Sequence, residues 1–128
     1  MKYFISGHRD ITEAEFNNYY APVIKHILGV DAEATFVVGD YHGVDIMAQN
    51  FLVACGMQDC TTVYHMFTAP RNHNVCITKC VGGFQTDEER DSAMTKASDF
   101  DIAFVRKGRW DSGTAQNIKR RATIRNME

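Results

Sequence analysis

Three short segments combine glycine with hydroxyl, imidazole or guanidinium side chains, which are groups that bind phosphate. They are Ser6-Gly7-His8-Arg9, Gly39-Asp40-Tyr41-His42-Gly43-Val44-Asp45 and Ser112-Gly113-Thr114. Each opens onto a helical pattern, and a helix start offers unpaired N–H groups and a positive dipole end to an anion. The pattern predicts a phosphate-binding protein. For Ser112 the alternative is a plain N-cap, which needs no ligand.

The side chains of the first two segments suggest further roles. Arg9 can donate two parallel hydrogen bonds to phosphate, although a surface pair with Asp10 is the alternative. Asp40 directly follows a strand, so we expect it to take part in chemistry. Asp45 either complements the helix dipole or acts on a ligand. The expected ligand-binding residues are Ser6, Gly7, His8, Arg9, Gly39, Gly43, Asp45, Ser112, Gly113 and Thr114.

Composition is that of an ordinary globular domain. The 128 residues are 45% hydrophobic and 23% charged, so we expect one domain over 1–128 with its own core. A formal charge of −2 argues against a protein that coats nucleic acid. Basic residues nevertheless gather between Arg106 and Arg125, which leaves a local anion site or an oligomer contact open.

Location and cofactors follow from what the chain lacks. No apolar run reaches about 18 residues, so we expect no membrane span. Met1-Lys2 leads directly into a strand without a secretory signal, and we expect a cytoplasmic protein. His65 and His73 could form a metal cluster with nearby cysteines, but we expect free thiols and no metal or other cofactor. The cysteines lack paired zinc-site spacing: Cys55, Cys60, Cys76 and Cys80.

Strands and helices alternate along the chain. Runs rich in β-branched and aromatic residues predict strands at 2–6, 35–38, 61–66, 101–105 and 122–126. Helical spacing and capping signals predict helices at 12–29, 43–56, 86–97 and 112–121. Pro22 should kink or split the first helix, and Gly29 should cap it. The alternation predicts an α/β fold, a small Rossmann-like three-layer α/β/α sandwich with a mostly parallel sheet of four to five strands.

Segment 67–85 fits neither period, and it contains Pro70 and Gly82-Gly83. Long irregular segments are often lids or binding loops, and a short strand near 75–77 is the alternative. Ligands of parallel α/β sheets bind at the carboxyl ends of the strands. We therefore expect the three glycine-containing turns to share that edge, with Arg9, Arg90 and Ser112 facing one cleft.

In motif order, most of the chain resembles the SLOG superfamily, which groups the "lonely guy" (LOG) nucleotide phosphoribohydrolases, the DNA-processing protein DprA and YspA-like proteins. Glu89-Arg90-Asp91-Ser92-Ala93-Met94 is similar to the Glu-Arg-Lys-Ala-x-Met of LOG enzymes. The Ser98-Asp99 pair, a strand and Ser112-Gly113-Thr114-Ala115-Gln116-Asn117 resemble their Ser-Asp, strand and Gly-Gly-x-Gly-Thr-x-x-Glu order. The segment 39–48 is similar to the Gly-x-x-x-Gly-x-Asp-x-x-Ala of DprA and YspA-like proteins, so the YspA-like branch is nearest.

The resemblance implies nucleotide binding, with Arg90 at the ligand. Arg90 has no acidic residue four positions away, so a surface pair at that spacing does not account for it. Two departures bear on catalysis: the Gly-Gly is absent, and Asn117 stands at the position of the catalytic Glu. Hydrolysis of an N-glycosidic bond requires a carboxylate near the developing oxocarbenium, and an amide carries no charge. Asp40, Asp10 or Glu89 would have to supply it, and the expected catalytic set is Asp40, Arg90 and Asn117.

Three functional hypotheses remain. The first is binding of a small-molecule nucleotide or nucleotide-derived phosphate at the carboxyl edge, with N-glycosidic hydrolysis as an open extension. The alternative is a DprA-like single-stranded nucleic-acid-binding module, for which Trp110 is the lone stacking candidate and Lys119 begins a basic tail. The third is an interaction domain whose ligand site has decayed. We expect neither nucleic acid nor membrane as a partner, and the resemblance leaves a homodimer open.

Overall fold

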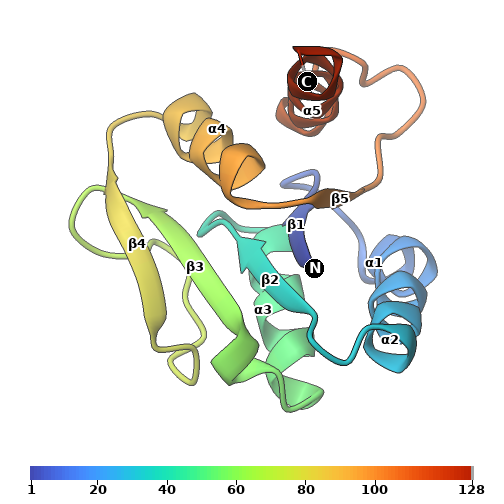
Figure 1. The fold of residues 1–128 in the computed structure, drawn as a ribbon, viewed down its shortest axis with the longest axis vertical. Helices are drawn as coiled ribbons and strands as arrows, with labels where there is room; N and C mark the ends of the chain where they lie inside the picture. The colour runs from blue at the N-terminus through green and yellow to red at the C-terminus, as the bar shows by residue number, and fades with distance from the viewer. Residues whose placement is uncertain (128) are drawn as a thin grey trace.

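The computed structural model describes residues 1–127, in which helices cover both faces of a single parallel sheet (Figure 1). The sheet has five strands in the order β4-β3-β2-β1-β5. They are β1 (Lys2–Ser6), β2 (Thr35–Val38), β3 (Thr61–Met66), β4 (Lys79–Phe84) and β5 (Phe100–Ala103). The prediction of an α/β, Rossmann-like sandwich is confirmed.

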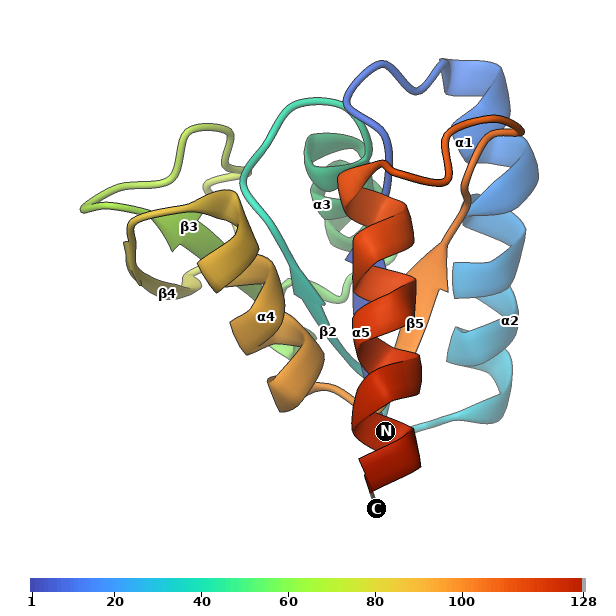
Figure 2. The ribbon, with the colours of Figure 1, turned by 90° about the horizontal axis from the view of Figure 1, so that it is seen from above.

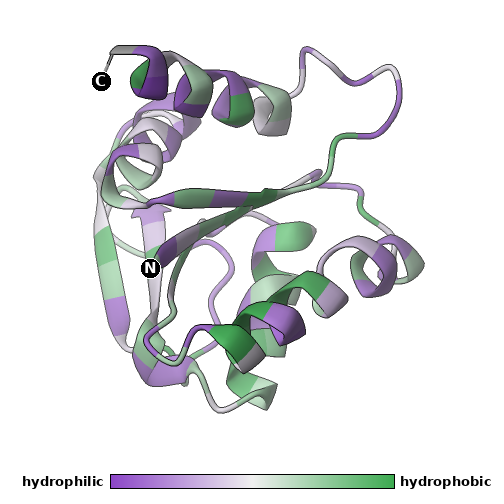
Figure 3. Cartoon of the chain, turned by 45° about the vertical axis from the view of Figure 1, so that its right-hand side comes forward, coloured by the Kyte–Doolittle hydropathy of each residue, from purple (hydrophilic) through white to green (hydrophobic). Residues whose placement is uncertain are grey.

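The helices form two layers. One face of the sheet carries α1, α2 and α3, and the other carries α4 and α5 (Figures 1 and 3). Their bounds are α1 (Glu13–Tyr19), α2 (Ala21–Val30), α3 (Val44–Ala54), α4 (Asp87–Ala97) and α5 (Gly113–Met127), with a short 3-10 helix at Gln58–Cys60. No helix within residues 1–127 is both long and apolar enough to cross a bilayer.

The hydrophobic core is unevenly divided between the two faces. Because neighbouring strand residues point to opposite faces, Ile5 packs into the large core under α1–α3 while Phe4 faces α4. The large core also holds Tyr20, Ile24 and Leu52, all fully buried. The core under α4 is much smaller and consists of Phe4, Val37 and Met94, with Tyr64 against it. Polar contacts must therefore contribute more to holding α4 and α5 against the sheet.

Local sequence signals set the entry to the first helical layer. Thr12 and Glu15 form the expected capping box, with Glu15 N donating to Thr12 Oγ1 at 3.1 Å and Thr12 N donating to Glu15 Oε1 at 3.0 Å. Pro22 does split the helical segment, because α2 starts with Pro22 in its first turn. Gly29 lies inside α2, which ends one residue later, so its predicted cap position is wrong.

Two predicted elements at the ends of the fold are corrected. Residues 122–126 belong to α5 rather than to a strand, because the Arg121 guanidinium ties this helix to the Ser98 carbonyl at 2.6 Å and to Asp101 at 2.9 Å. Segment 67–85 contains the edge strand β4, later in the chain than the suggested strand near 75–77. Its Gly82 is needed because a Cβ there would overlap the His65 ring.

The rest of that segment, 67–78, is anchored to the strand ends rather than free to act as a lid. Arg71 N donates to Asp40 Oδ2 at 3.0 Å, and Asn72 N donates to the Asp40 carbonyl at 3.0 Å. The buried Gln49 amide bridges the carbonyls of Gly39 and Asn72 at 3.0 and 3.1 Å. These contacts tie the segment to β2 and α3.

Candidate functional site

One cleft gathers the three glycine-containing turns at the carboxyl edge of the sheet. The loops after β1 and β2 and the start of α5 lie at the same end of the molecule (Figure 2). Between them and α4 is a hollow of about 610 Å³, which we call the α4–α5 cleft. The predicted site residues that line it are Ser6, Gly7, His8, Arg9, Asp45, Arg90, Ser112, Gly113, Thr114 and Asn117. Arg9, Arg90 and Ser112 thus share one cleft, whereas Gly39, Asp40 and Gly43 are not part of its lining.

The turn after β1 is held against the large core. Gly7 has no room for a side chain, because a Cβ would overlap Val44 and lie 2.5 Å from the Tyr20 hydroxyl. That hydroxyl donates to the Ser6 carbonyl at 2.8 Å and accepts from Phe104 N at 2.9 Å. The Ser6 hydroxyl is buried at the cleft and has no hydrogen-bond partner within residues 1–127. A buried hydroxyl without a partner is costly, so a ligand atom here would be favourable.

His8 forms part of the cleft as a neutral ring. Its Nε2 accepts a hydrogen bond from Arg106 N at 2.9 Å, which places the ring proton on Nδ1. Burial, together with the positive charges of Arg109 and Arg106, lowers the pKa of His8. The side chain therefore supplies a neutral group to the cleft.

The glycines of the second turn serve packing rather than ligand approach. Gly43 has a φ of 81°, and a Cβ would overlap the Arg9 carbonyl oxygen and lie 2.6 Å from that of His8. Val44 N donates to the same His8 carbonyl at 3.3 Å, so the turns after β1 and β2 are in direct contact. A Cβ on Gly39 would lie 3.0 Å from Arg90 Cζ. Both glycines let other parts of the site pack closely behind the cleft.

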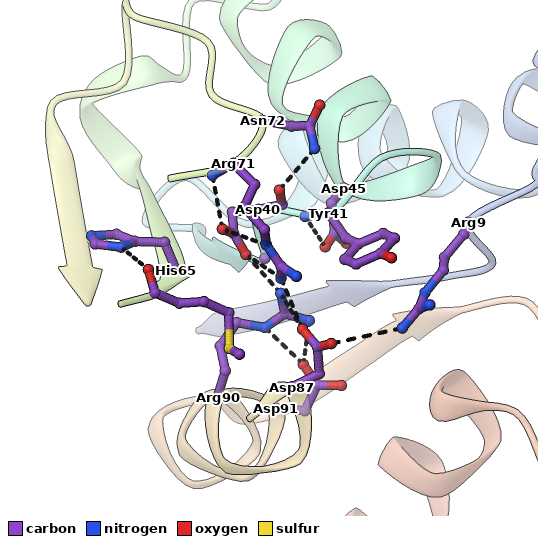
Figure 4. A network of polar contacts seen from close by, with 12 residues as sticks. Arg9, Asp40, Tyr41, Asp45, His65, Arg71, Asn72, Asp87, Arg90 and Asp91 are labelled. Carbon is purple, nitrogen blue, oxygen red and sulfur yellow. Dashed lines mark hydrogen bonds and ion pairs between the residues drawn. The ribbon is translucent and has the colours of Figure 1, made fainter. Parts of the chain in front are cut away.

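Asp40 is fully buried behind the cleft, where it joins two arginines (Figure 4). Its Oδ1 accepts from Arg90 Nη1 at 2.7 Å and from Arg71 Nη2 at 2.9 Å, and its Oδ2 accepts from Arg71 Nε at 3.1 Å. Burial alone would raise the pKa of Asp40, but the hydrogen bonds from Arg71 hold it at about 2. The carboxylate links segment 67–78 to α4, and it does not reach the cleft.

Arg90 is buried, with its side chain 7% exposed, and its donors are occupied by the fold. Besides Asp40, it binds Asp91 Oδ1 through Nε at 3.1 Å and through Nη2 at 2.8 Å. Nη1 also lies 3.3 Å from Asp87. The acidic partners of Arg90 are thus Asp87, three positions before it, Asp91, the next residue, and Asp40 at the end of β2. A search for acidic residues four positions away does not find any of them.

Asp45 is a buried acid in the first turn of α3. Its Oδ2 accepts from Tyr41 N at 3.0 Å (Figure 4). Burial raises the pKa of Asp45 to about 7, although the positive charge of Arg90 opposes the rise. The side chain thus combines a structural hydrogen bond with an unusual protonation state.

Arg9 lies on the outer side of the cleft and is 59% exposed. Its guanidinium stacks on the Tyr41 ring at 3.9 Å from the centroid and lies 3.7 Å from Asp87. Asp10, the alternative partner, instead pairs with Arg106 at 2.9 Å. Tyr41 was not among the predicted residues, although its position in the second turn was a usable signal.

The third turn begins α5 as expected. Ser112 is the N-cap, since its Oγ accepts from Ala115 N at 3.2 Å. The first turn of a helix leaves N–H groups without intrahelical acceptors, here those of Gly113 and Thr114. The space around Gly113 is open, with nothing within 4 Å of where a Cβ would stand. Gly113 and Thr114 are both among the residues that line the cleft, so the start of α5 faces it.

Asn117 faces Asp91 across the cleft. Its Nδ2 donates to Asp91 Oδ2 at 3.2 Å, while its Oδ1 accepts from Arg120 Nη1 at 2.6 Å. Sequence reasoning missed Asp91. The available signal was that Asp91 stands at the Lys position of the Glu-Arg-Lys-Ala-x-Met motif.

Several basic residues near the C-terminus make contacts within the chain, and Arg109 and Arg120 contribute to the lining of the cleft. Arg106 binds Glu15 through Nε at 2.8 Å, and Arg125 binds the Asp99 carbonyl at 2.9 Å. Trp110 is 62% exposed on the loop before α5, which is largely hydrophilic (Figure 3).

The cysteines and histidines outside the cleft do not assemble into a metal site. All four cysteines are free thiols. His73 Nε2 lies 2.7 Å from the Ile77 carbonyl and 3.7 Å from Cys80 Sγ. In the part of the chain that the structure describes, no group of three or more His, Cys, Asp or Glu side chains is arranged to hold a metal ion.

Comparisons of the chain with models of protein families, with curated proteins and with solved structures find no match. The fold and the site define a class of protein: a parallel, Rossmann-like α/β domain with a polar cleft at the carboxyl ends of its strands. A particular activity must be argued from the cleft itself.

Proposed function

We propose that the protein binds a nucleotide or nucleotide-derived phosphate in the α4–α5 cleft, and that it belongs to the SLOG superfamily near the YspA-like branch. The observation that carries the binding proposal is the meeting of the unpartnered Ser6 hydroxyl, the open start of α5 and Arg9 in one cleft. The family membership rests on the motifs alone.

The phosphate would lie at the start of α5. There the N–H groups of Gly113 and Thr114 and the positive end of the helix dipole favour a negative charge. Ser6, which lines the same cleft, would donate through its Oγ to this phosphate and gain the partner that the hydroxyl lacks. Arg9 can leave its weak surface contact with Asp87 and add a charged donor.

The side of the cleft that α4 forms, which we call the α4 wall, is suited to the sugar of the ligand. It contributes the carboxylates Asp87, Glu88 and Asp91, which would repel an extended polyphosphate but accept hydrogen bonds from sugar hydroxyls. Tyr41 and His42 bring aromatic rings to the cleft, and these favour a planar base. A single phosphate on a sugar fits this division, and about 610 Å³ is within the usual size of small-molecule sites.

Hydrolysis of the N-glycosidic bond of such a ligand is a second part of the proposal. Asp40, the carboxylate predicted from its place directly after a strand, is fully buried and is not part of the cleft lining, so it is poorly placed for the reaction. The acidic α4 wall can supply a carboxylate instead. Nucleic-acid binding is less well supported, because several basic residues near the C-terminus contact their own chain.

Thermal denaturation with a panel of inorganic phosphate, pyrophosphate and nucleoside mono-, di- and triphosphates tests binding. A ligand at 100 times its Kd stabilises the folded state by about 2.7 kcal/mol. We expect a nucleoside monophosphate to raise the melting temperature more than its triphosphate does. A flat response across the whole panel would overturn the proposal.

Substitutions at Gly113 locate the site. Gly113→Asp places a carboxylate where phosphate should bind, while an acidic residue in the first helical turn helps α5 to form. We expect this variant to fold and to lose the response to ligand. Gly113→Ala is the matched control, because its Cβ meets open space and adds no charge. Equal binding by wild type and Gly113→Asp would place the ligand elsewhere.

A further inference from the structure

Asp91 is a carboxylate of the cleft lining that the proposed phosphate contacts do not use and that the fold holds in a defined orientation. Asp91 lies on α4, and its side chain is 15% exposed. Arg90 donates to its Oδ1 through both Nε and Nη2, and Asn117 donates to its Oδ2 at 3.2 Å. Each oxygen therefore has a donor, while the group still contributes to the lining of the cleft.

Asn117 is itself oriented. Its Oδ1 accepts from Arg120 at 2.6 Å, so the amide presents its Nδ2 to Asp91. This arrangement requires an anion at 91 and a donor at 117. A Glu at 117 would bring a second negative charge close to Asp91, which is unfavourable for both.

Asp91 stands at the Lys position of the Glu-Arg-Lys-Ala-x-Met motif, and Asn117 stands at the Glu position of the Gly-Gly-x-Gly-Thr-x-x-Glu motif. In this chain the carboxylate of the pair therefore lies on α4, and the amide that binds it lies on α5.

We infer that Asp91 is the catalytic carboxylate for hydrolysis of the bond between the base and the sugar of a bound nucleotide, with Asn117 as a positioning residue. This inference rests on the proposed function. The water oxygen bonds to the anomeric carbon, and the carbon–nitrogen bond breaks with its electron pair passing to the base. The proton that water loses passes to Asp91 and then to solvent, and the departing base takes one proton from solvent. Asp91 also stabilises the positive charge that develops on the sugar.

The other acidic candidates are less well placed. Asp10 is 62% exposed and bound to Arg106. Glu89 is exposed, accepts from Gln85 N at 3.4 Å and is not part of the cleft lining. Asp87 pairs with Arg71 at 2.8 Å, and its side chain is 36% exposed. Asp91 combines low exposure, fixed orientation and a position in the cleft.

Chromatography of released base from a panel of nucleoside monophosphates tests the inference. We expect wild type to release base, and Asp91→Asn to lower kcat by about 10²- to 10⁴-fold with little change in KM, since the phosphate contacts are untouched. The exchange variant Asp91→Asn/Asn117→Asp keeps the net charge and reverses the direction of the hydrogen bond between the two positions. It should recover part of kcat, which a purely structural role for Asp91 does not predict.

Each outcome decides between the proposals. Binding of a nucleotide without release of base from any substrate overturns the inference but leaves the proposed binding function intact. Full activity in Asp91→Asn also overturns it, and absence of binding removes both. If the Asp91→Asn variant does not fold, the Asn117→Asp variant tests the catalytic role of Asp91 instead. This variant keeps Asp91 and adds a second carboxylate beside it. Two such groups share a proton, so the pH–rate profile should gain an ionisation, and an unchanged profile refutes the inference.

Discussion

The buried Asp45 makes a quantitative prediction about stability. Its carboxyl accepts a single hydrogen bond from Tyr41 N, and it has a pKa of about 7. Asp45→Asn removes the ionisation but keeps an oxygen that can accept the same hydrogen bond. The substitution therefore separates the cost of burying a charge from the loss of a contact.

The sign follows from proton binding in the two states. The usual pKa of 3.8 in the unfolded chain is below that of the folded protein, so between these values the folded state holds a proton that the unfolded state has lost. Raising the pH through this window therefore destabilises the wild type by about 1.4 kcal/mol per pH unit. From about pH 5 to about pH 7 the loss from Asp45 is about 2–3 kcal/mol, and it levels off above pH 7.

Urea denaturation of wild type and Asp45→Asn at several pH values between about 5 and 8 measures this effect. The free-energy difference between the two proteins should move by about 2–3 kcal/mol in favour of the variant as pH rises. His8 acts in the opposite direction, because its lowered pKa makes stability fall as pH drops below about 6.5, but it is common to both proteins and cancels. Asp59→Asn, at an exposed position, is the control. Parallel stability curves for wild type and Asp45→Asn would refute the reasoning.

Two further substitutions test the packing behind the cleft. Asp40→Ala leaves the buried Arg90 without its strand-end partner, and we expect a loss of about 3–5 kcal/mol in urea denaturation, with faster proteolysis in 67–78. Proteolysis at the wild-type rate would contradict the anchoring. Gly43→Ala should cost about 2–4 kcal/mol, because its φ is positive and a Cβ overlaps a carbonyl oxygen. Gly29→Ala, in open space within α2, should instead stabilise by about 0.5–1 kcal/mol, and equal stabilities for these two variants would count against the close packing of the turns.

Features with local causes could be predicted from the sequence. Pro22 splits the first helical segment because a proline is tolerated only in the first turn of a helix, and Ser112 caps α5 through a hydrogen bond three residues away. The edge strand β4 was missed because Gly82-Gly83 weakens any strand pattern, and its place depends on the distant His65 ring. The length of α5 was missed for a similar reason, since the Arg121 contact with Ser98 is not local.

The meeting of the three turns at one cleft could be predicted, but which of their side chains line that cleft could not. Polar turns after parallel strands must meet at one edge, so Ser6 and Ser112 were expected to share a cleft. Whether a residue in such a turn faces the cleft or packs behind it depends on neighbours far along the chain. Asp40 is turned away by Arg71, which lies in a segment without a recognisable pattern. Asp91 was missed because a charged helix residue next to an arginine is usually a solvent-exposed one.

The uneven core and the chemistry of the cleft have a common cause. Only a small apolar cluster lies under α4, so buried ionic contacts contribute to holding this layer. Asp40 at the end of β2 binds Arg90, and Arg90 in turn binds Asp91 in the cleft. Because the same guanidinium binds both acids, the position of Asp91 depends on Asp40, although Asp40 is not part of the cleft lining. In the proposed reaction, a conservative change such as Asp40→Asn should therefore lower kcat for base release more than it weakens the proposed binding of phosphate at the start of α5.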